Sequence, residues 1–410
     1  MTNWEEQKFG DLYLIPSRNG LTRPSSVRGA GYKFINMGEI FSYNRIGNIE
    51  TELVQLNEKE KKEMTLQKND LLFARQSLVF SGAGKCSIML DVEDVVSFES
   101  HLIRVRLNPE IANPMFYYYY FSLPYNSVKT IVQQCAQAGI RGSDLEKIKV
   151  PCPHIEIQNQ IADILSTYDD LIEANNRRIE LLEQTAQELY KEWFVRFRFP
   201  GYENAKFENG LPERWELKKI GDIAHVKSGY AFKSEWWIDE GVPVVKIKDI
   251  QGNTIDFGDL SHVSEDHAEI AKQFYIVEGD LLIAMTGATI GKMALVPYSE
   301  KQMVVNQRVG KFFLGESPSE KVAFLYMTLQ QNWVQELIVM IAGSNAAQPN
   351  ISPFDIEKIK VVYNEDMVDE YNRRSAPFIE EILQLRKQNQ NLATQRDMLL
   401  PRLMSGKLEV

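Results

Sequence analysis

The sequence predicts an α+β fold in which two similar mixed α/β domains are joined by two long antiparallel coiled-coil helices, related by a pseudo-twofold axis. Two observations support this prediction. The chain of 410 residues repeats itself after about 210 residues. Each copy of the repeat is followed by a long stretch with the apolar spacing of a helix that packs along a partner helix. A chain of this length is also expected to form two to three domains.

The repeat consists of matching segments that occur in the same order in both halves. The clearest pair is Asp144–Val150 (DLEKIKV) with Asp355–Val361 (DIEKIKV). The other pairs are Trp4–Asp11 with Trp215–Asp222, Tyr32–Ile40 with Val242–Ile250, Lys68–Ala74 with Glu278–Ala284, and Gly84-Lys85 with Gly291-Lys292. Because these pairs bracket each half, a whole module is duplicated. We therefore predict globular domains at residues 1–150 and 200–360.

The first predicted long helix, in a central region at residues 151–199, has no glycine or proline between residues 156 and 199. Its apolar positions recur in steps of three and four, as in a coiled-coil seam. One extra step of four falls at Asn175, where such a stutter locally unwinds a supercoil and a polar residue can fix the register. The predicted seam positions are Ile161, Ile164, Tyr168, Leu171, Asn175, Ile179, Leu182 and Leu189.

The second predicted long helix lies in the C-terminal region, residues 361–410, and completes the pair. Pro377 is expected to kink it or to begin a fresh helix capped by Ser375. Pro401 and Gly406 mark its expected end. Its principal seam positions are Phe378, Ile382, Leu385, Leu392 and Leu399.

Within each module the pattern is mixed. Alternating and β-branched residues predict strands within residues 94–107 and 302–314. Apolar segments at 114–123 and 321–343 predict helices packed on a sheet. We interpret the aromatic run Tyr117–Phe121 as part of an aromatic-rich core helix, with a base-stacking platform as the alternative.

Composition restricts the function classes. The net charge is −10, and no basic tail or stripe is present, so charge alone does not indicate nucleic acid. Three cysteines without a CxxC pair disfavour both a disulfide framework and a zinc site. No run of 18 apolar residues occurs, and the first residues are acidic where a signal peptide is basic. We expect a cytoplasmic protein without a metal, a cofactor or a membrane span.

The order of these motifs resembles the specificity subunit of type I restriction–modification enzymes. The central run ADILSTYDDLIEANNRRIELLEQTAQELYKEWFVRFRFPG and the terminal RDMLLPRLMSGKLEV resemble the two helical regions of that family. The segments GDLLIAMTGATIGKMAL and NDLLFA resemble the core of its target recognition domains. The resemblance covers the whole chain, and the globular modules are its weaker part.

This resemblance implies a non-catalytic subunit in which each target recognition domain reads one half of a bipartite, asymmetric sequence in double-stranded DNA. It also implies that the helices set the spacing between the halves and dock two methyltransferase (modification) subunits. Restriction and translocase subunits would complete the complex.

The loops that follow the two DLL strands are the first candidates for DNA contact, because arginine and glutamine recognise base edges and hydroxyl groups suit phosphates. A solvated surface hairpin is the alternative interpretation. The candidates here are Arg75, Gln76, Ser77 and Lys85 in the first domain, and Thr286, Thr289 and Lys292 in the second.

A second group of candidates lies in the turns near the start of each module and in the loop before the predicted strand DLEKIKV. We align Ser17, Arg18, Asn19 and Gly20 with Lys227, Ser228, Gly229 and Tyr230, and Arg141 and Gly142 with residues 348–350. Two further pairs, His101 with Arg104 and Gln307 with Arg308, are interpreted as structural strand faces.

Two other function classes remain as alternatives. A non-catalytic scaffold with duplicated protein-binding modules would explain the acidic charge. An enzyme is disfavoured: Gly287–Lys292 resembles a phosphate loop but is one residue short, and Asn113–Phe116 resembles a methyltransferase motif without a glycine-rich cofactor loop.

Overall fold

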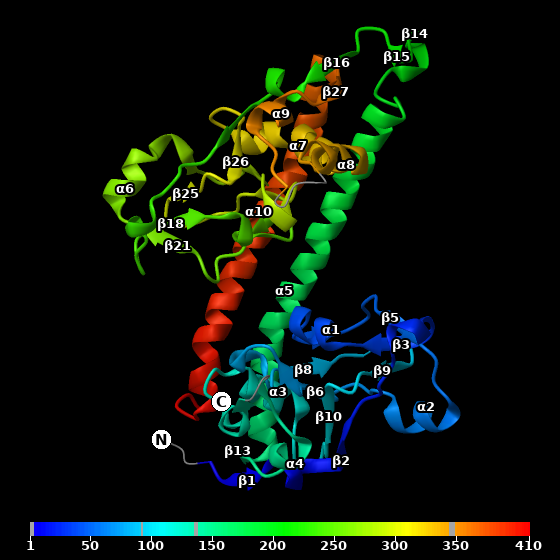
Figure 1. Ribbon diagram of the computed structural model, residues 1–410, viewed down its shortest axis with the longest axis vertical. Coiled ribbons are helices and arrows are strands. Elements are labelled where there is room, and N and C mark those ends of the chain that lie inside the picture. The colour runs from blue at the N-terminus through cyan, green and yellow to red at the C-terminus, as the bar shows by residue number, and fades with distance from the viewer. Residues whose placement is uncertain (1–3, 92, 135–137, 344–348) are drawn as a thin grey trace. The chain divides into compact units, whose positions relative to one another are not determined.

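A computed structural model describes residues 4–91, 93–134, 138–343 and 349–410 (Figure 1). The chain divides into two compact units. The first unit contains residues 1–171 and 392–410, and the second contains residues 172–391. Helix α5 (Ile155–Tyr190), which continues as a short π-helix (Lys191–Val195), and helix α10 (Glu365–Met404) each contribute to both units.

The first unit is built on a five-stranded sheet in the order β2-β10-β6-β8-β4 and a three-stranded sheet in the order β5-β3-β9. The strands of the larger sheet are β2 (Tyr13–Asn19), β10 (Leu102–Leu107), β6 (Leu71–Ala74), β8 (Cys86–Met89) and β4 (Arg45–Ile46). Those of the smaller sheet are β5 (Glu52–Val54), β3 (Arg28–Ile35) and β9 (Val96–Phe98). The remaining elements are β1 (Glu6–Lys8), β7 (Gln76–Ser77), β11 (Gln133–Gln134), β12 (Ala138–Gly139), β13 (Lys149–Pro151), α1 (Met37–Ser42), α2 (Glu58–Met64), α3 (Pro114–Ser122) and α4 (Gly142–Leu145).

The second unit repeats this plan with two four-stranded sheets, β17-β26-β23-β24 and β21-β18-β25-β22. The first consists of β17 (His225–Ser228), β26 (Val309–Phe313), β23 (Leu281–Ala284) and β24 (Met293–Leu295). The second consists of β21 (Ser261–Val263), β18 (Val242–Val245), β25 (Met303–Val305) and β22 (Tyr275–Ile276). The remaining elements are β14 (Phe207–Glu208), β15 (Leu211–Pro212), β16 (Glu216–Lys219), β19 (Ile250–Gln251), β20 (Thr254–Ile255), β27 (Lys360–Tyr363), α6 (Glu265–Ile270), α7 (Pro318–Leu329), α8 (Asn332–Ile341) and α9 (Pro353–Glu357).

The sequence repeat is a repeat of strand pairing. In both units the strand that opens the module pairs antiparallel with the strand that closes it, β1 with β13 and β16 with β27. The strands from the DLL segments, β6 and β23, are buried at every position and lie in the middle of their sheets. Each is preceded by a turn with a left-handed residue, Asn69 (φ 70°) or Gly279 (φ 86°). The predicted α+β class with two similar domains is confirmed.

A buried aspartate closes each of these turns. The Asp70 carboxylate accepts a hydrogen bond from the Gln67 amide, and the Asp280 carboxylate accepts one from the Val277 amide, each at 2.8 Å. The charge of Asp70 is compensated by Arg106 at 2.6 Å, and that of Asp280 by Lys311 at 2.7 Å. A buried carboxylate is tolerated only with such a partner, so the basic residue on the neighbouring strand is part of the turn.

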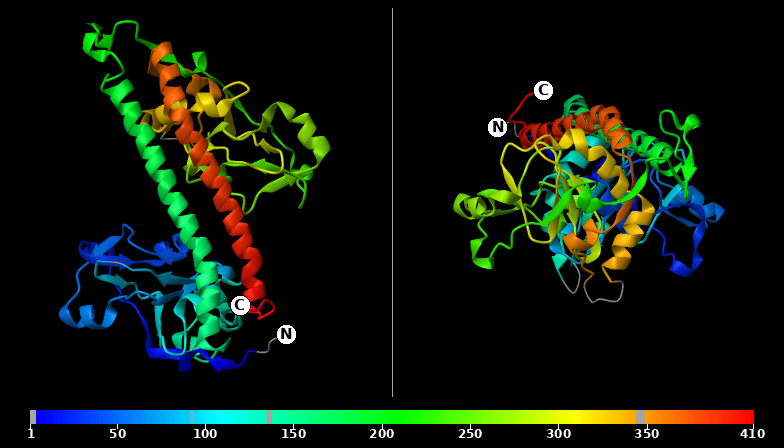
Figure 2. Two further views of the ribbon diagram at one scale, coloured as in Figure 1. Left: turned by 180° about the vertical axis from the view of Figure 1, so that it is seen from behind. Right: turned by 90° about the horizontal axis from the view of Figure 1, so that it is seen from above.

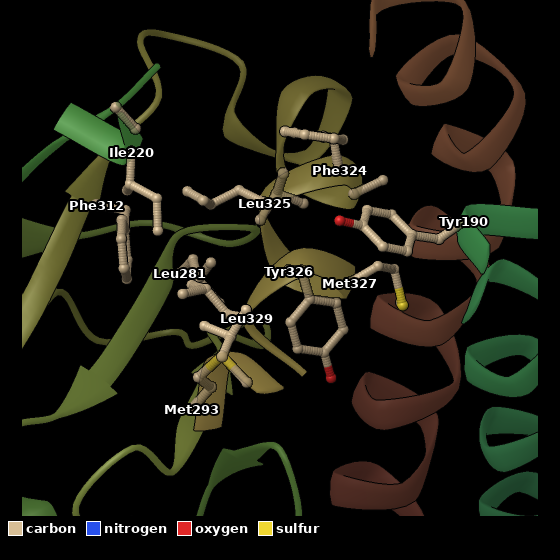
Figure 3. Close-up of a cluster of buried hydrophobic side chains, with 14 of the residues drawn as sticks. Tyr190, Ile220, Leu281, Met293, Phe312, Phe324, Leu325, Tyr326, Met327 and Leu329 are labelled. Carbon is tan, nitrogen blue, oxygen red and sulfur yellow. The ribbon is translucent and has the colours of Figure 1, made fainter. Parts of the chain in front are cut away.

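Helices α3 and α7 connect the sheets to the long helices. The aromatic run of α3 is buried, with Tyr117 and Phe121 packed against Phe9 of the sheet side, so the core-helix interpretation is confirmed. Asn113 caps α3 by accepting hydrogen bonds from the Met115 and Phe116 amides. In Figure 3, Leu325 and Leu329 of α7 point toward Leu281 and Phe312, whereas Phe324 and Met327 point toward the long helices.

The long helices are antiparallel within each unit. In the second unit, Asn175 Nδ2 donates to Asn389 Oδ1 at 2.9 Å, and further along, the Tyr371 hydroxyl donates to the Ala186 carbonyl at 2.8 Å. In the first unit, Ile161 and Leu165 of α5 share a core cluster with Leu403 near the end of α10. Figure 2 (left) shows α10 between α5 and the sheets of the second unit.

The seam prediction is wrong at two positions. The side chain of Ile164 is 36% exposed, while its neighbour Leu165 is fully buried, and Leu171 is 47% exposed. The reason is that α5 buries its face against the core of its own unit as well as against α10, which rotates the buried stripe. The other predicted seam residues are buried or partly buried. They are Ile161, Tyr168, Asn175, Ile179, Leu182, Leu189, Phe378, Ile382, Leu385, Leu392 and Leu399.

Three smaller predictions also need correction. Helix α10 continues through Pro377 and Pro401 although each proline removes one hydrogen bond, so no fresh helix begins at Ser375. The predicted helix at 321–343 is two helices, α7 and α8. The segments DLEKIKV and DIEKIKV each begin as a short helix, α4 or α9, and only then form a strand.

A tyrosine, a carboxylate and an arginine join each unit to both long helices. In the second unit the Glu183 carboxylate of α5 accepts from the Tyr326 hydroxyl (2.7 Å) and from the Arg386 guanidinium (3.1 Å). In the first unit Asp169 of α5 accepts from Tyr119 (2.6 Å) and pairs with Arg396 of α10. Burial, followed by the neighbouring carboxylate, raises the pKa of both tyrosines, so they remain hydrogen-bond donors.

Replacing Arg386 with alanine should lower the stability of the second unit by about 3 kcal/mol, because Glu183 then remains largely buried without its cation. Denaturation of the full chain, followed by tryptophan fluorescence, would measure the change. The control is Arg373→Ala, which removes an exposed arginine of the same helix and should have little effect. Equal losses in the two variants would show that the buried pair adds nothing.

Candidate nucleic-acid interface

The first unit has an open cleft of about 370 Å³ where three separate segments meet. We call it cleft 1. It is formed by the end of strand β2, the residue after strand β6, and the N-terminus of helix α4. Its lining residues are Ser17, Arg18, Asn19, Arg75, Arg141, Gly142, Ser143 and Glu146. Six of the predicted DNA-contacting residues, from three segments, are therefore brought together: Ser17, Arg18, Asn19, Arg75, Arg141 and Gly142.

The second unit has a cleft of about 280 Å³ in the corresponding place, which we call cleft 2. It lies at the end of strand β17, after strand β23, in the β25–β26 turn and before helix α9. Its lining residues are Ser228, Met285, Thr286, Gln307, Arg308, Asn350, Ile351, Ser352 and Pro353. Of the predicted residues in this unit, Ser228, Thr286 and Asn350 line the cleft.

The two clefts occupy equivalent positions because their backbone hydrogen bonds match. The Arg75 amide donates to the His101 carbonyl, and the Met285 amide donates to the Arg308 carbonyl. The Ile140 amide donates to Arg75, and the Ile351 amide donates to Met285. Arg75 thus corresponds to Met285, His101 to Arg308, and by the same register Arg141 to Ser352.

Three of the four arginines that line the clefts have no side-chain partner among the described residues. Most arginines in the described part of the chain donate to a carboxylate or a carbonyl group. Arg75, Arg141 and Arg308 make no such side-chain contact with any described residue. Arg18, at the rim of cleft 1, pairs with Glu63 at 2.8 Å, and both side chains are substantially exposed. Three unpaired guanidinium groups at two concave surfaces are suited to binding an anion or a base edge.

Hydroxyl and carboxylate groups complete the clefts. Ser17 Oγ donates to Glu146 Oε1 at 2.8 Å, so Glu146 orients the floor of cleft 1. In cleft 2 the Thr286 side chain is 7% exposed, and its hydroxyl has no partner among the described residues. A buried hydroxyl without a partner costs free energy, which favours a ligand that supplies one.

Comparison with known proteins shows the family to which this chain belongs. The family described as "Type I restriction modification DNA specificity domain" matches residues 1–184 and 212–363. The chain belongs to the type I restriction–modification specificity subunits. It is 24% identical to the MjaVIII specificity subunit of Methanocaldococcus jannaschii, over all of this chain and 93% of that protein. It is 22% identical to the HindI specificity subunit of Haemophilus influenzae, over the full length of both.

A solved structure supports the fold. The crystal structure of the specificity subunit from M. genitalium aligns with a TM-score of 0.56 and 18% identity, over 98% of this chain and 96% of that one. As a member of this family, the specificity subunit described here provides DNA sequence specificity through two repeated domains. No helix of the described residues is long and apolar enough to cross a membrane.

Seven predicted residues of the specificity subunit do not line a cleft. Gln76 and Ser77 form strand β7, which pairs with β12. Lys85 donates to the Phe41 carbonyl, and its partial burial lowers the pKa of its ammonium group. Thr289 donates to the Thr286 carbonyl, and Lys292 is exposed beyond the turn. Strand β17 places Lys227 over Phe313, and Tyr230 stacks on Trp236.

The predicted alignment of the two turns is off by one residue. Gly20 and Gly229 make the matching backbone contacts, so Arg18 corresponds to Lys227 and Asn19 to Ser228. Gly139 corresponds to Asn350, so the counterparts of Arg141 and Gly142 are Ser352 and Pro353. Residue 348, part of the earlier alignment, lies outside the described residues.

Two residues of the second cleft lie in a different element from the one predicted. Gln307 and Arg308 were interpreted as strand residues, but they lie in the turn between β25 and β26, where both are exposed. His101 lies in the equivalent turn of the first unit. The asparagine–glutamine–arginine run between two apolar strands is a turn signal that could have revealed them.

Replacing Gly20 with alanine should lower the stability of the first unit by about 2–3 kcal/mol and disturb cleft 1. A Cβ atom there would lie 2.1 Å from the Phe98 carbonyl oxygen and 2.4 Å from that of Glu99. Gly38→Ala is the control, because a Cβ atom at Gly38 meets nothing within 4 Å and Gly38 lies in helix α1. Thermal denaturation of both variants measures the difference; a stable Gly20→Ala variant would contradict the close approach.

Proposed function

We propose that cleft 1 and cleft 2 are the surfaces through which this specificity subunit reads duplex DNA. Each cleft would read one half of a bipartite, asymmetric site. The observation that carries this proposal is that two equivalent clefts hold unpaired arginines at positions that are not equivalent. Arg75 and Arg141 correspond to Met285 and Ser352, whereas Arg308 corresponds to His101.

The different positions of the arginines support two different half-sites. An arginine that reaches a base edge pairs with guanine, and moving it from one loop to another changes which base pair it can reach. Cleft 1 carries arginines after β6 and at helix α4, and cleft 2 carries one in the β25–β26 turn. Two copies of one fold can therefore recognise two unrelated sequences.

We assign the two target recognition domains to residues 1–150 and 200–360, and the spacer helices to residues 151–199 and 361–410. The helices would dock two methyltransferase subunits, and restriction and translocase subunits would join the same assembly. This chain would be non-catalytic itself. Its acidic net charge supports shared phosphate contacts, because a basic partner can supply the charge that this chain lacks.

Replacing Arg75 with alanine should relax or change only the half-site read by the first domain, and Arg308→Ala only that read by the second. A lost bidentate contact costs about 1–3 kcal/mol of discrimination at one base pair. Methylome sequencing of a host that carries each variant with the methyltransferase subunit gives the methylated motif.

The control for these variants is Arg214→Ala. It removes an exposed arginine that lies outside both clefts and the spacer helices and has no side-chain partner among the described residues, and it should leave the motif unchanged. The proposal fails if the wild-type motif is a palindrome, or if Arg75→Ala and Arg308→Ala alter both half-sites equally.

Inserting seven residues into both α5 and α10 should lengthen each helix by about 10 Å. If the helices set the spacing, the non-specific gap between the half-sites then grows by about three base pairs. An insertion into α5 alone is the control; it should abolish methylation, because the seam positions of the two helices no longer match. An unchanged gap after the double insertion would refute this role.

A further inference from the structure

The segment between β6 and β8 carries three consecutive large apolar residues that face solvent. Leu78 is 87% exposed, Val79 is 59% exposed and Phe80 is 45% exposed. We call residues 78–80 the apolar tip. Phe41 lies against its base, because a Cβ atom at Gly82 would come within 3.1 Å of the Phe41 ring. Exposed runs of large apolar residues are unfavourable in water and usually mark a contact surface.

The second unit shows that the loop does not need this tip to fold. Both loops are closed by the same hydrogen bond, from Gly84 to the Ala74 carbonyl (2.8 Å) and from Gly291 to the Ala284 carbonyl (2.9 Å). Nine residues, 75–83, lie between these points in the first unit, but only six, 285–290, in the second. The loop of the second unit instead packs Ile290 against its core. The first unit therefore carries a three-residue extension that is apolar.

The tip is held in place by hydrogen bonds at its base. The Lys129 ammonium group donates to the carbonyls of Ser81 (2.8 Å) and Ala83 (3.3 Å). The Gly82 amide donates to the Val79 carbonyl at 3.2 Å. A side chain on a fixed loop loses little conformational entropy when it binds. The apolar tip is therefore held in one conformation before it binds a partner.

The charged side chains of the loop itself are positive. Between residues 74 and 90 the only charged side chains are Arg75 and Lys85, and Lys129 adds a third cation. The apolar tip is also close to cleft 1 along the chain. Arg75 lines the cleft, and strand β7 connects Arg75 to Leu78. An apolar tip flanked by cations is complementary to a partner with an anionic surface and an apolar interior. Duplex DNA, with its phosphates outside and stacked bases inside, has this character.

We propose that Leu78, Val79 and Phe80 form a wedge that enters the duplex beside the half-site read by the first domain and partly unstacks a base step there. This inference rests on the proposed function of cleft 1. The second domain has no such extension, so only one half of the bipartite site is deformed. Deformability of the sequence beside the first half-site then contributes to recognition without a base contact.

The test uses the complex of the full chain with its methyltransferase subunit and a duplex that carries the methylated motif. 2-Aminopurine, whose fluorescence rises when it is unstacked, replaces adenine beside the first or the second half-site. The variant is Leu78→Ser with Val79→Ser. Leu78→Met with Val79→Ile is the matched control, because it keeps the tip apolar. Ala288→Ser tests an exposed residue of the shorter loop.

The wedge predicts a fluorescence rise beside the first half-site only. The serine variant should lose this rise and bind the duplex about tenfold more weakly, while the methionine–isoleucine variant and Ala288→Ser keep both. A serine variant that binds and unstacks like the wild type would overturn the proposal. So would loss of the methyltransferase from the complex with the DNA signal retained, because the tip would then dock protein. A wild-type complex with no site-specific affinity would overturn the proposed function as well.

Discussion

The packing of the two long helices against the sheets is the constraint on which the rest of the structure depends. In neither unit do the sheets alone bury the helix that packs on them, which is α3 in the first unit and α7 in the second. In the second unit, α7 is covered by Tyr190 and Trp193 from the α5 region and by Tyr371 and Ile382 from α10, in one continuous core. In the first unit, the residues around α3 are covered by the start of α5 and the end of α10. The hydrophobic core of each unit therefore requires residues from both long helices.

This dependence explains why the helical parts are regular and the loops are not. A helix that packs against both a partner helix and a sheet must fit both surfaces along its buried face, and its buried polar groups must be matched. The pairings of Glu183 with Arg386 and of Asp169 with Arg396 show this matching. The loops at clefts 1 and 2 are not constrained by helix packing in this way. Their side chains can differ between the two units while the backbone hydrogen bonds stay the same.

The duplicated fold and the differing clefts together suit a protein that reads two unlike sequences. The shared elements are those that fold the domain: the buried DLL strand, the aspartate turn and the glycine that lets β2 or β17 approach the neighbouring turn. The differing elements are the arginines, the hydroxyl groups and the length of the loop after β6 or β23. Folding and recognition are thus carried by different residues of the same segments.

The sequence by itself determined the α+β class, the duplication and the two long helices, because strand and helix periodicity are local properties of the chain. It also indicated the segments that meet in the clefts, since Ser17, Arg75 and Arg141 are each next to a predicted strand or turn. Only the tertiary structure decided that these three residues share one cleft, and that Arg308, at the position equivalent to His101, lines the other. Which loops converge depends on sheet order, and sheet order is fixed by contacts between residues far apart in the chain. For the same reason the buried face of α5 was predicted incorrectly at Ile164: its packing surface is formed by the whole unit.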